Sequence, residues 1–259
     1  MTTLTPQGHA LGWNRPLPGL TYPTADLSGV VIKTEVDPRH SMPPAFDQLR
    51  LGSCTANATN RCFRYDTIMD GKDCGELSRL WTYFFERSIE HTLDQGDCGA
   101  MGHDAFTVAH HGIPDETLWP YDIAKFEEKP PACWIPGHTG KRNYTLTKEV
   151  KAVPQSLTAI QQALSTNQTI PFGFSVYESF ESEQTANTGI MPMPKPGEEI
   201  LGGHEVLACG YLKKYPHYIL VLNSWNTSWG LNGYFLMPVA FLLDNNYASD
   251  LRTICRPSV

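Results

Sequence analysis

The sequence predicts an α+β fold, in which a helical half precedes a half built from antiparallel strands. Apolar residues of the first half recur every three or four positions, as in amphipathic helices. The second half contains four apolar, β-prone segments: residues 170–176, 205–212, 218–225 and 233–239. A Pro- and Gly-rich stretch, residues 129–140, separates the halves. We therefore expect a helical domain over residues 44–140 and an antiparallel sheet or barrel over residues 141–259.

The remaining segment, residues 1–43, precedes both domains. It has prolines at positions 6, 16, 18, 23, 38 and 43 and no sustained helical or strand period. This composition favours an extended chain that lies over the surface of the folded domains.

The helical elements follow in order. The first predicted helix starts at Cys54, and its apolar positions recur every three or four residues until Gly71, which suits a helix end. Ser78 is a suitable N-cap for the second. A third helix is expected over residues 104–111, and a short fourth over residues 156–164, ahead of the first long strand.

Composition restricts the function. The 259 residues carry 20 Lys and Arg against 27 Asp and Glu, a formal charge of −7, which disfavours a nucleic-acid-binding surface. There is no run of 18 apolar residues, so no membrane span is expected, and the N-terminus lacks the basic and apolar regions of a signal peptide. We expect a monomer. The seven cysteines show no zinc-ligand spacing, so no metal or other cofactor is expected.

Four residues from the two halves indicate a function only when they are considered together. Cys54 follows Gly52 and opens a helix, whose positive end favours a thiolate. Gln48, six residues earlier, supplies an amide donor, while His204 and Asn223 lie on or beside strands of the other half. A thiol, a base, an orienting amide and an oxyanion donor are what nucleophilic catalysis by cysteine requires.

Three blocks carry a family resemblance. FDQLRLGSCTANA, GGHEVLACGY and NSWNTSWGLNGYF occur in this order and resemble the signature blocks of papain-like cysteine peptidases. The resemblance runs from about residue 44 to about residue 238. The variant LGSCTANA, together with an early GW and LP, is most similar to a divergent microbial-type branch. The family's architecture, a helical left domain and a β-barrel right domain with the active-site cleft between them, is the fold that the resemblance implies.

The resemblance also implies catalytic roles. Cys54 would be the nucleophile and His204 the general acid/base, with Asn223 orienting the imidazole through its amide oxygen. Gln48 and the backbone N–H of Cys54 would form the oxyanion hole, and Trp225 would shield the contact between His204 and Asn223. The implied activity is hydrolysis of peptide bonds in protein or peptide substrates through a thioester, and protein inhibitors are possible partners.

By the same resemblance, five residues would bind substrate: Gly99, Ala100, Gly203, Glu205 and Trp229. Ala100 lies on the edge that would hydrogen-bond an extended substrate backbone. Glu205 stands where relatives have a small residue in the pocket for the second residue before the scissile bond. We hypothesise that its carboxylate selects Lys or Arg there. The alternative is that Glu205 points to solvent or to a structural partner.

The family pattern is broken at three further positions. Leu49 and Asn226 replace glycines in turns that favour positive φ. Leu51 stands where many relatives have a disulfide cysteine, so that bridge is absent. Because residues 1–43 are Pro-rich and extended in character, we also hypothesise that they lie across the cleft and restrain the enzyme.

Two alternative functions stay open at this point. A transpeptidase or ligase would use the same thioester and differ only in whether an amine or water attacks it. A catalytically silent member used for binding is disfavoured by the presence of all four catalytic residue types, although Leu49 and Asn226 keep it open.

Overall fold

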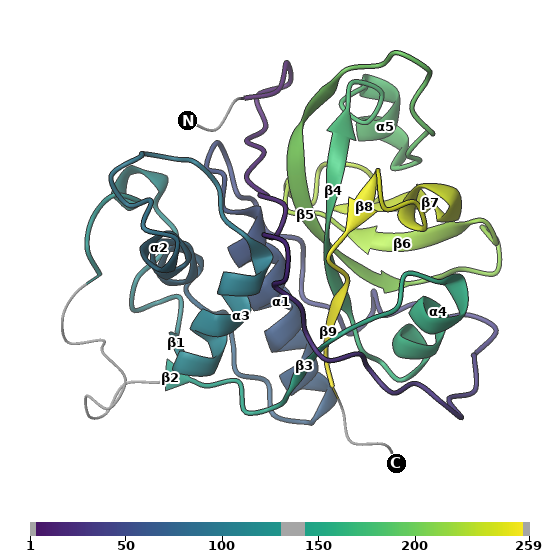
Figure 1. Cartoon of the computed structure of the whole chain (residues 1–259), viewed down its shortest axis with the longest axis horizontal. Coiled ribbons are helices and arrows are strands. Elements are labelled where there is room, and N and C mark those ends of the chain that lie inside the picture. The colour runs from purple at the N-terminus through teal and green to yellow at the C-terminus, as the bar shows by residue number, and fades with distance from the viewer. Residues whose placement is uncertain (1–3, 131–142, 256–259) are drawn as a thin grey trace.

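A computed structural model describes residues 4–130 and 143–255, and its elements fall into a helical side and a sheet side (Figure 1). The α+β architecture expected from the sequence is confirmed. The three helices of the first half are α1 (Cys54–Met69), α2 (Arg79–Ile89) and α3 (Gly102–His111). Ser78 caps α2, where its side chain accepts a hydrogen bond from the backbone N–H of Trp81.

The second half is organised around one five-stranded antiparallel sheet. Its order is β7-β6-β5-β4-β8, so that β5 is the central strand and β4 runs beside it over most of its length. The strands are β4 (Ile170–Tyr177), β5 (Ile200–Gly210), β6 (Tyr218–Leu222), β7 (Tyr234–Pro238) and β8 (Ala248–Ser249). Strands β4 to β7 correspond to the four β-prone segments, and α4 (Leu157–Ser165) to the short predicted helix.

Several short elements carry too few residues to show a periodic pattern, and the sequence did not predict them. They are β1 (Ile113–Pro114), β2 (Asn143–Tyr144), β3 (Val150–Ala152), β9 (Arg252–Ile254), the 3₁₀ helix η1 (Ile123–Lys125), α5 (Glu183–Thr188) and α6 (Val239–Leu242). Strands β1 and β2 form one antiparallel pair, and β3 and β9 form another.

The two faces of the central sheet pack into two different apolar cores. Along β5, Val206 and Ala208 belong to a core that includes α4, whereas Leu207 and Cys209 belong to the core of the three large helices. This alternation follows from the two-residue period of a strand. Apolar residues therefore pack against both faces of β5, and this packing fixes the position of the residues in the first half of the strand, including His204.

Residues before 44 form no helix or continuous strand in the part that the structure describes. They make isolated bridges instead, among them Trp13 with Ala100 and Val36 with Tyr211. Figure 1 shows this purple segment passing between the helices and the sheet. The interdomain stretch expected at 129–140 falls largely within residues 131–142, outside the described residues.

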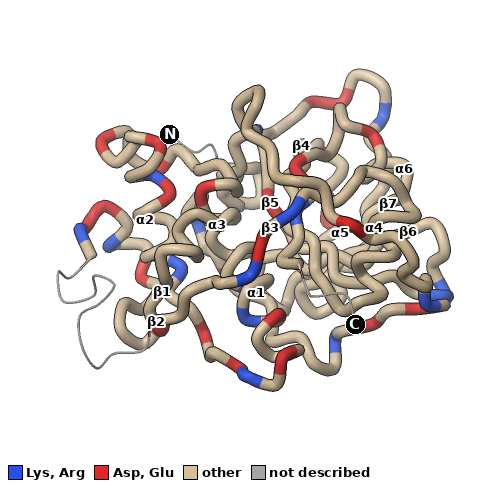
Figure 2. The backbone as a smooth tube through the Cα atoms, turned by 60° about the horizontal axis from the view of Figure 1, so that its bottom comes forward, with Lys and Arg blue, Asp and Glu red and all other residues tan. Residues whose placement is uncertain are grey.

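Charged residues of both signs are interspersed along the chain, and Lys and Arg are not gathered over one element in the view of Figure 2. None of the described helices combines the length and the apolar composition needed to cross a membrane.

Candidate active site

Cys54 is the first residue of α1 and is fully buried. Backbone groups of Glu205 and Gly12 hydrogen-bond to its sulfur, so the thiol lies against the start of β5, next to His204. Burial outweighs these hydrogen bonds and raises the pKa of the thiol to about 12. In this arrangement Cys54 is therefore a neutral thiol near pH 7, despite its place at a helix N-terminus.

His204 and Asn223, whose pairing the family resemblance implies, lie in contact. The imidazole Nε2 lies 2.8 Å from the Oδ1 of Asn223, and this oxygen also accepts a hydrogen bond from the backbone N–H of Ser224. Because Oδ1 acts as an acceptor, Nε2 carries the proton of the neutral imidazole and Nδ1 has a free lone pair. Nδ1 is buried and has no hydrogen-bond partner within the described residues. The nitrogen left available is thus the one that can take a proton from a thiol.

Aromatic rings enclose this pair. Trp225 stacks on His204 with ring centroids 4.8 Å apart, and Trp229 packs edge-on against Trp225 at 5.3 Å. The enclosure desolvates the imidazole and lowers the pKa of His204 to about 4. Trp225 therefore lies where the sequence predicts a shield, and Trp229 supports it from the side.

Gln48 is fully buried beside this pair. Its Oε1 accepts a hydrogen bond from the Ser224 hydroxyl at 2.6 Å, which leaves the Nε2 amide as the donor. That amide donates to the backbone oxygens of Leu51 and Ala10, both at 3.0 Å. Ala10 belongs to the N-terminal segment, so a main-chain carbonyl of this chain occupies the donor expected to bind the substrate oxyanion.

The replacements at Leu49 and Asn226 retain the backbone that glycine would favour. Leu49 has φ 54° and Asn226 has φ 71°, both in the left-handed region. Asp47 contacts both residues: its carboxylate accepts a hydrogen bond from the backbone N–H of Leu49 at 2.8 Å and another from the side-chain amide of Asn226 at 3.1 Å. The turns on either side of the site thus keep their shape without glycine.

The N-terminal segment runs through the predicted substrate edge. The N–H of Ala100 donates to the oxygen of Gly12 at 2.8 Å, and the N–H of Asn14 donates to the oxygen of Ala100 at 2.9 Å. On the opposite side, the N–H of Trp13 donates to the oxygen of Gly203 at 3.0 Å. The structure therefore brings Ala100 and Gly203 together around one extended segment, with Gly99 next to Ala100 at a φ of 73°.

The structure does not support a charge-selecting role for Glu205. Its carboxylate is fully buried and pairs with Arg252 at 2.8 Å, and Arg252 also contacts the carboxylate of Asp250. Gly102 leaves room for the pair, since a Cβ there would stand 1.9 Å from Oε2 of Glu205. Burial raises the pKa of Glu205 to about 7 in spite of Arg252. The sequence left open whether Glu205 selects a charged substrate side chain or has a structural partner, and the structure supports the second, with Arg252 as that partner.

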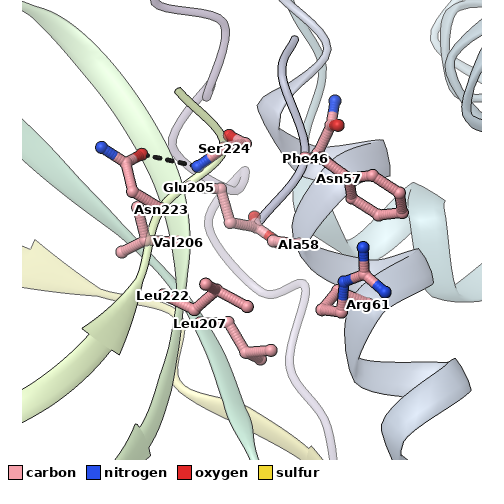
Figure 3. Close-up of a pocket in the computed structure, with 10 residues that line it drawn as sticks. All are labelled: Phe46, Asn57, Ala58, Arg61, Glu205, Val206, Leu207, Leu222, Asn223 and Ser224. Carbon is pink, nitrogen blue, oxygen red and sulfur yellow. Dashed lines mark hydrogen bonds between the residues drawn. The ribbon is translucent and has the colours of Figure 1, made fainter. Parts of the chain in front are cut away.

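Beneath the site, a small cavity of about 10 Å³ lies between β5 and α1. Glu205 and Asn223 line it on the side of the sheet (Figure 3). Asn57 and Arg61 of α1 line the other side. A volume of this size corresponds to about one water molecule.

Sequence reasoning missed an anchor on the helical side of the site. The carboxylate of Asp97 accepts from the N–H of Gly52 at 2.9 Å and also from the hydroxyl of Tyr83. The same hydroxyl accepts from the N–H of Gly99 at 3.1 Å. Asp97 thereby joins the turn before Cys54 to the substrate edge. The only signal in the sequence was an acidic residue two positions before Gly99.

Among the described residues, no group of three or more His, Cys, Asp or Glu side chains is placed to hold a metal ion. The groups that meet at the site are a thiol, an imidazole and amide donors.

Comparison with known proteins agrees with this chemistry. Residues 32–242 match the family described as papain family cysteine protease. An uncharacterised peptidase C1-like protein of Acanthamoeba polyphaga mimivirus is 35% identical over 238 residues, covering 88% of this chain and 76% of that protein. Cysteine proteinase 3 of Entamoeba histolytica is 25% identical, covering 85% of this chain and 69% of that protein.

Among solved structures, xylellain, a cysteine protease from Xylella fastidiosa, superposes with a TM-score of 0.83 at 28% identity, covering 94% of this chain and 95% of that one. The match spans both the helical and the sheet side. The chain belongs to the papain family of cysteine proteases.

Proposed function

We propose that the protein is an endopeptidase that hydrolyses peptide bonds through a thioester on Cys54. The observation that carries the proposal is the pairing of His204 with Asn223 at 2.8 Å, which directs the free Nδ1 of His204 away from Asn223. A nearby thiol, an oriented base and an amide donor on Gln48 are the parts that acyl transfer needs.

In the first step, Nδ1 of His204 takes the proton of Cys54 and the sulfur attacks the substrate carbonyl carbon. The negative oxygen that develops is stabilised by the Nε2 amide of Gln48 and by the backbone N–H of Cys54. The imidazolium then protonates the leaving amine, the C–N bond breaks and a thioester remains. In the second step, His204 deprotonates a water molecule, whose oxygen attacks the thioester carbonyl carbon. The C–S bond breaks, the carboxylic acid product leaves, and the imidazolium returns the proton to the sulfur.

We also propose that residues 5–14 hold the enzyme latent. In the present arrangement the Ala10 carbonyl occupies the Gln48 donor, and the burial of Cys54 and His204 keeps both groups neutral. Release of the segment would admit water and a substrate, lowering the pKa of Cys54 and raising that of His204 toward the charged pair.

Chain direction explains how such a segment escapes cleavage. The Ala10 carbonyl lies at the Gln48 donor, and Trp13, three residues further toward the C-terminus, lies beside Ala100 and Gly203. A substrate would reach the same edge by proceeding toward its N-terminus, because the pocket there receives the second residue before the scissile bond. The segment therefore lies in the opposite direction and presents no correctly oriented peptide bond.

Hydrolysis of fluorogenic dipeptides tests the proposal, with the chain freed of residues 1–15 compared with the same chain carrying Cys54→Ala. The variant should have no activity, and one equivalent of iodoacetamide label, carried by the peptide that contains residue 54, should be lost. Gln48→Ala should lower kcat by about 10²–10³-fold, as loss of an oxyanion donor does in other acyl-transfer enzymes. A wild-type chain whose hydrolysis does not depend on Cys54 would contradict the mechanism.

Product analysis in the presence of an added amine separates hydrolysis from transfer. A hydrolase should yield mainly the free acid. Dominant amide product at millimolar amine would instead identify a transpeptidase or ligase, and absence of any turnover or labelling of Cys54 after removal of residues 1–15 would identify a silent binding protein.

A further inference from the structure

Glu181 carries a nearly buried carboxylate whose hydrogen bonds, among the described residues, come from the N-terminal segment. Its side chain is 3% exposed. The hydroxyl of Thr5 donates to Oε2 at 2.9 Å, and Nδ1 of His9 lies 3.1 Å from the same oxygen. Release of the segment would therefore remove the partners of this acid. A carboxylate in such a place is costly unless another donor replaces the lost ones.

The imidazole of His9 also lies flat on Trp225. The ring centroids are 3.9 Å apart and the planes differ by 5°. His204 stacks on the same indole, with centroids 4.8 Å apart and planes 23° apart. Two rings at these distances on one face would overlap, so His9 and His204 occupy opposite faces of the indole. The face of Trp225 turned away from the catalytic imidazole is thus the one that release of the segment would open.

The order of residues in the segment places this face relative to the scissile bond. The Ala10 carbonyl lies at the oxyanion donor, and Trp13 lies where the substrate residues before the scissile bond would bind. His9 lies on the other side of Ala10. We infer that Glu181 and the outer face of Trp225 form a cation-binding subsite for one of the first two residues after the scissile bond, with Arg preferred. The inference rests on the proposed function and names the substrate class of that site.

The position of Glu181 does not depend on the segment that covers it. Phe180, directly before it, is 1% exposed and packs against Trp225 and Trp229 with centroids 5.4 and 5.6 Å apart. Ser182, directly after it, is the N-cap of α5 and accepts a hydrogen bond from within that helix. These contacts lie outside residues 1–43. The carboxylate should therefore stay beside the indole when the segment leaves.

The two groups of the subsite select for charge and shape together. An indole face attracts a cation, and a planar guanidinium can stack on it while donating two hydrogen bonds to a carboxylate. The ammonium of Lys can pair with Glu181 but cannot stack in this way. An Ala side chain would leave the carboxylate without a partner, and a Glu side chain would be repelled. The expected order of preference is therefore Arg, Lys, Ala and Glu.

The first test measures this preference. A protease site inserted between Arg15 and Pro16 allows the full chain to fold before residues 1–15 are cut off and removed by gel filtration. Internally quenched peptides, identical up to the scissile bond, carry Arg, Lys, Ala or Glu at the first residue after it or, in a second series, at the second. In one of the two series, kcat/KM for the Arg peptide should exceed that for the Ala peptide by at least about tenfold, the usual size of a charge-assisted hydrogen bond.

A pair of variants assigns the preference to one carboxylate. Glu181→Gln should lower kcat/KM for the Arg and Lys peptides by about tenfold and change that for the Ala peptide by less than about twofold. Glu183→Gln is the matched control, because it removes the same charge from an exposed side chain two residues away and should retain the preference. A thermal unfolding transition in each variant confirms that it is folded.

The second test needs no turnover and uses the uncut full chain. His9→Arg should keep Cys54 as protected from iodoacetamide as in the wild type, whereas His9→Glu should speed labelling of the peptide that contains residue 54 by about tenfold. Each substitution is then combined with Glu181→Gln. The two double variants should label at rates within about threefold of each other, because the charge that distinguishes Arg from Glu at position 9 has been removed.

Equal kcat/KM for the Arg and Ala peptides in both series, or equal labelling of His9→Arg and His9→Glu, would overturn this inference and leave the proposed peptidase intact. An Arg preference that survives Glu181→Gln would overturn it as well. Absence of hydrolysis of every peptide by the folded, cut chain would overturn both this inference and the proposed function.

Discussion

At the scale of single residues, the closed site is held in an uncharged state by burial. The thiol of Cys54 has a raised pKa and the imidazole of His204 a lowered one, and desolvation is the largest cause in both. Asn223 opposes the lowering of the His204 pKa, because its Oδ1 accepts a hydrogen bond from the Nε2–H of the imidazole. Under the proposed latency, the same side chains account for both the inactive and the active form, and their exposure to solvent decides between the two.

The pKa of His204 predicts a pH-dependent stability. Its pKa is about 4 in the folded chain and 6.5 is the ordinary value, so between these pH values the unfolded chain binds a proton that the folded chain does not. Stability from this group is therefore lost as the pH falls from about 6.5 to 4, by up to about 3 kcal/mol.

Urea unfolding of the wild type and of His204→Asn at pH 7 and pH 4 measures this effect. The free energy of unfolding of the wild type should fall relative to that of the variant on acidification. A difference between the two proteins that does not change with pH would show that the imidazole is not desolvated as described.

At the scale of elements, the turn before α1 and the loop before α3 are tied together without a disulfide. Next to Leu51, the backbone N–H of Gly52 donates a hydrogen bond to the carboxylate of Asp97. Tyr83 of α2 extends the connection to Gly99. A charged acceptor in a partly buried place makes a stronger hydrogen bond than a neutral one, so Asp97 can position both edges of the site.

We predict that Asp97→Ala lowers kcat by about tenfold, because Gly52 and Gly99 lose the anchor that fixes the backbone beside Cys54. Asp97→Asn retains one oxygen acceptor and should recover most of the rate. The nearby exposed Asp94→Ala serves as the control and should leave kcat unchanged.

Steady-state kinetics on one dipeptide and thermal unfolding of each variant distinguish positioning from simple stability. If Asp97→Ala lost stability at an unchanged kcat, or if Asp97→Asn were as slow as Asp97→Ala, the carboxylate would have no positioning role.

At the scale of the whole molecule, residues 1–43 do two different things. Residues 5–14 line the substrate edge, and His9 is held by Glu181 at 3.1 Å and by stacking on Trp225 at 3.9 Å. Further along, Leu27 and Val36 are buried in the core of the sheet and Met42 in the core of the helices. The first part covers the site, and the second is part of the folded body.

Two truncations should therefore behave differently. Removal of residues 1–15 should raise the rate of dipeptide hydrolysis, since it frees Gln48 and exposes Cys54. Removal of residues 1–43 would also delete the buried side chains of Leu27, Val36 and Met42 and expose the core residues that pack against them. Each lost side chain should lower the free energy of unfolding by about 1.5–3 kcal/mol, so we expect an unstable protein.

Hydrolysis rates and thermal unfolding midpoints of the two truncated chains and the full chain test this division. Equal rates for the full chain and the chain lacking residues 1–15, both folded, would contradict latency. A stable chain lacking residues 1–43 would contradict the structural role of its second part.

The sequence by itself determined the helices that start at Cys54 and after Ser78, the four long strands and the papain family, because these depend on local periodicity, capping and motif spacing. It also indicated that Cys54 and His204 act together. Tertiary structure alone decided that Glu205 meets Arg252, that Asp97 reaches Gly52 and that Trp13 lies on Gly173. These contacts join segments far apart in the chain, and their energies depend on burial and on the neighbours that packing supplies.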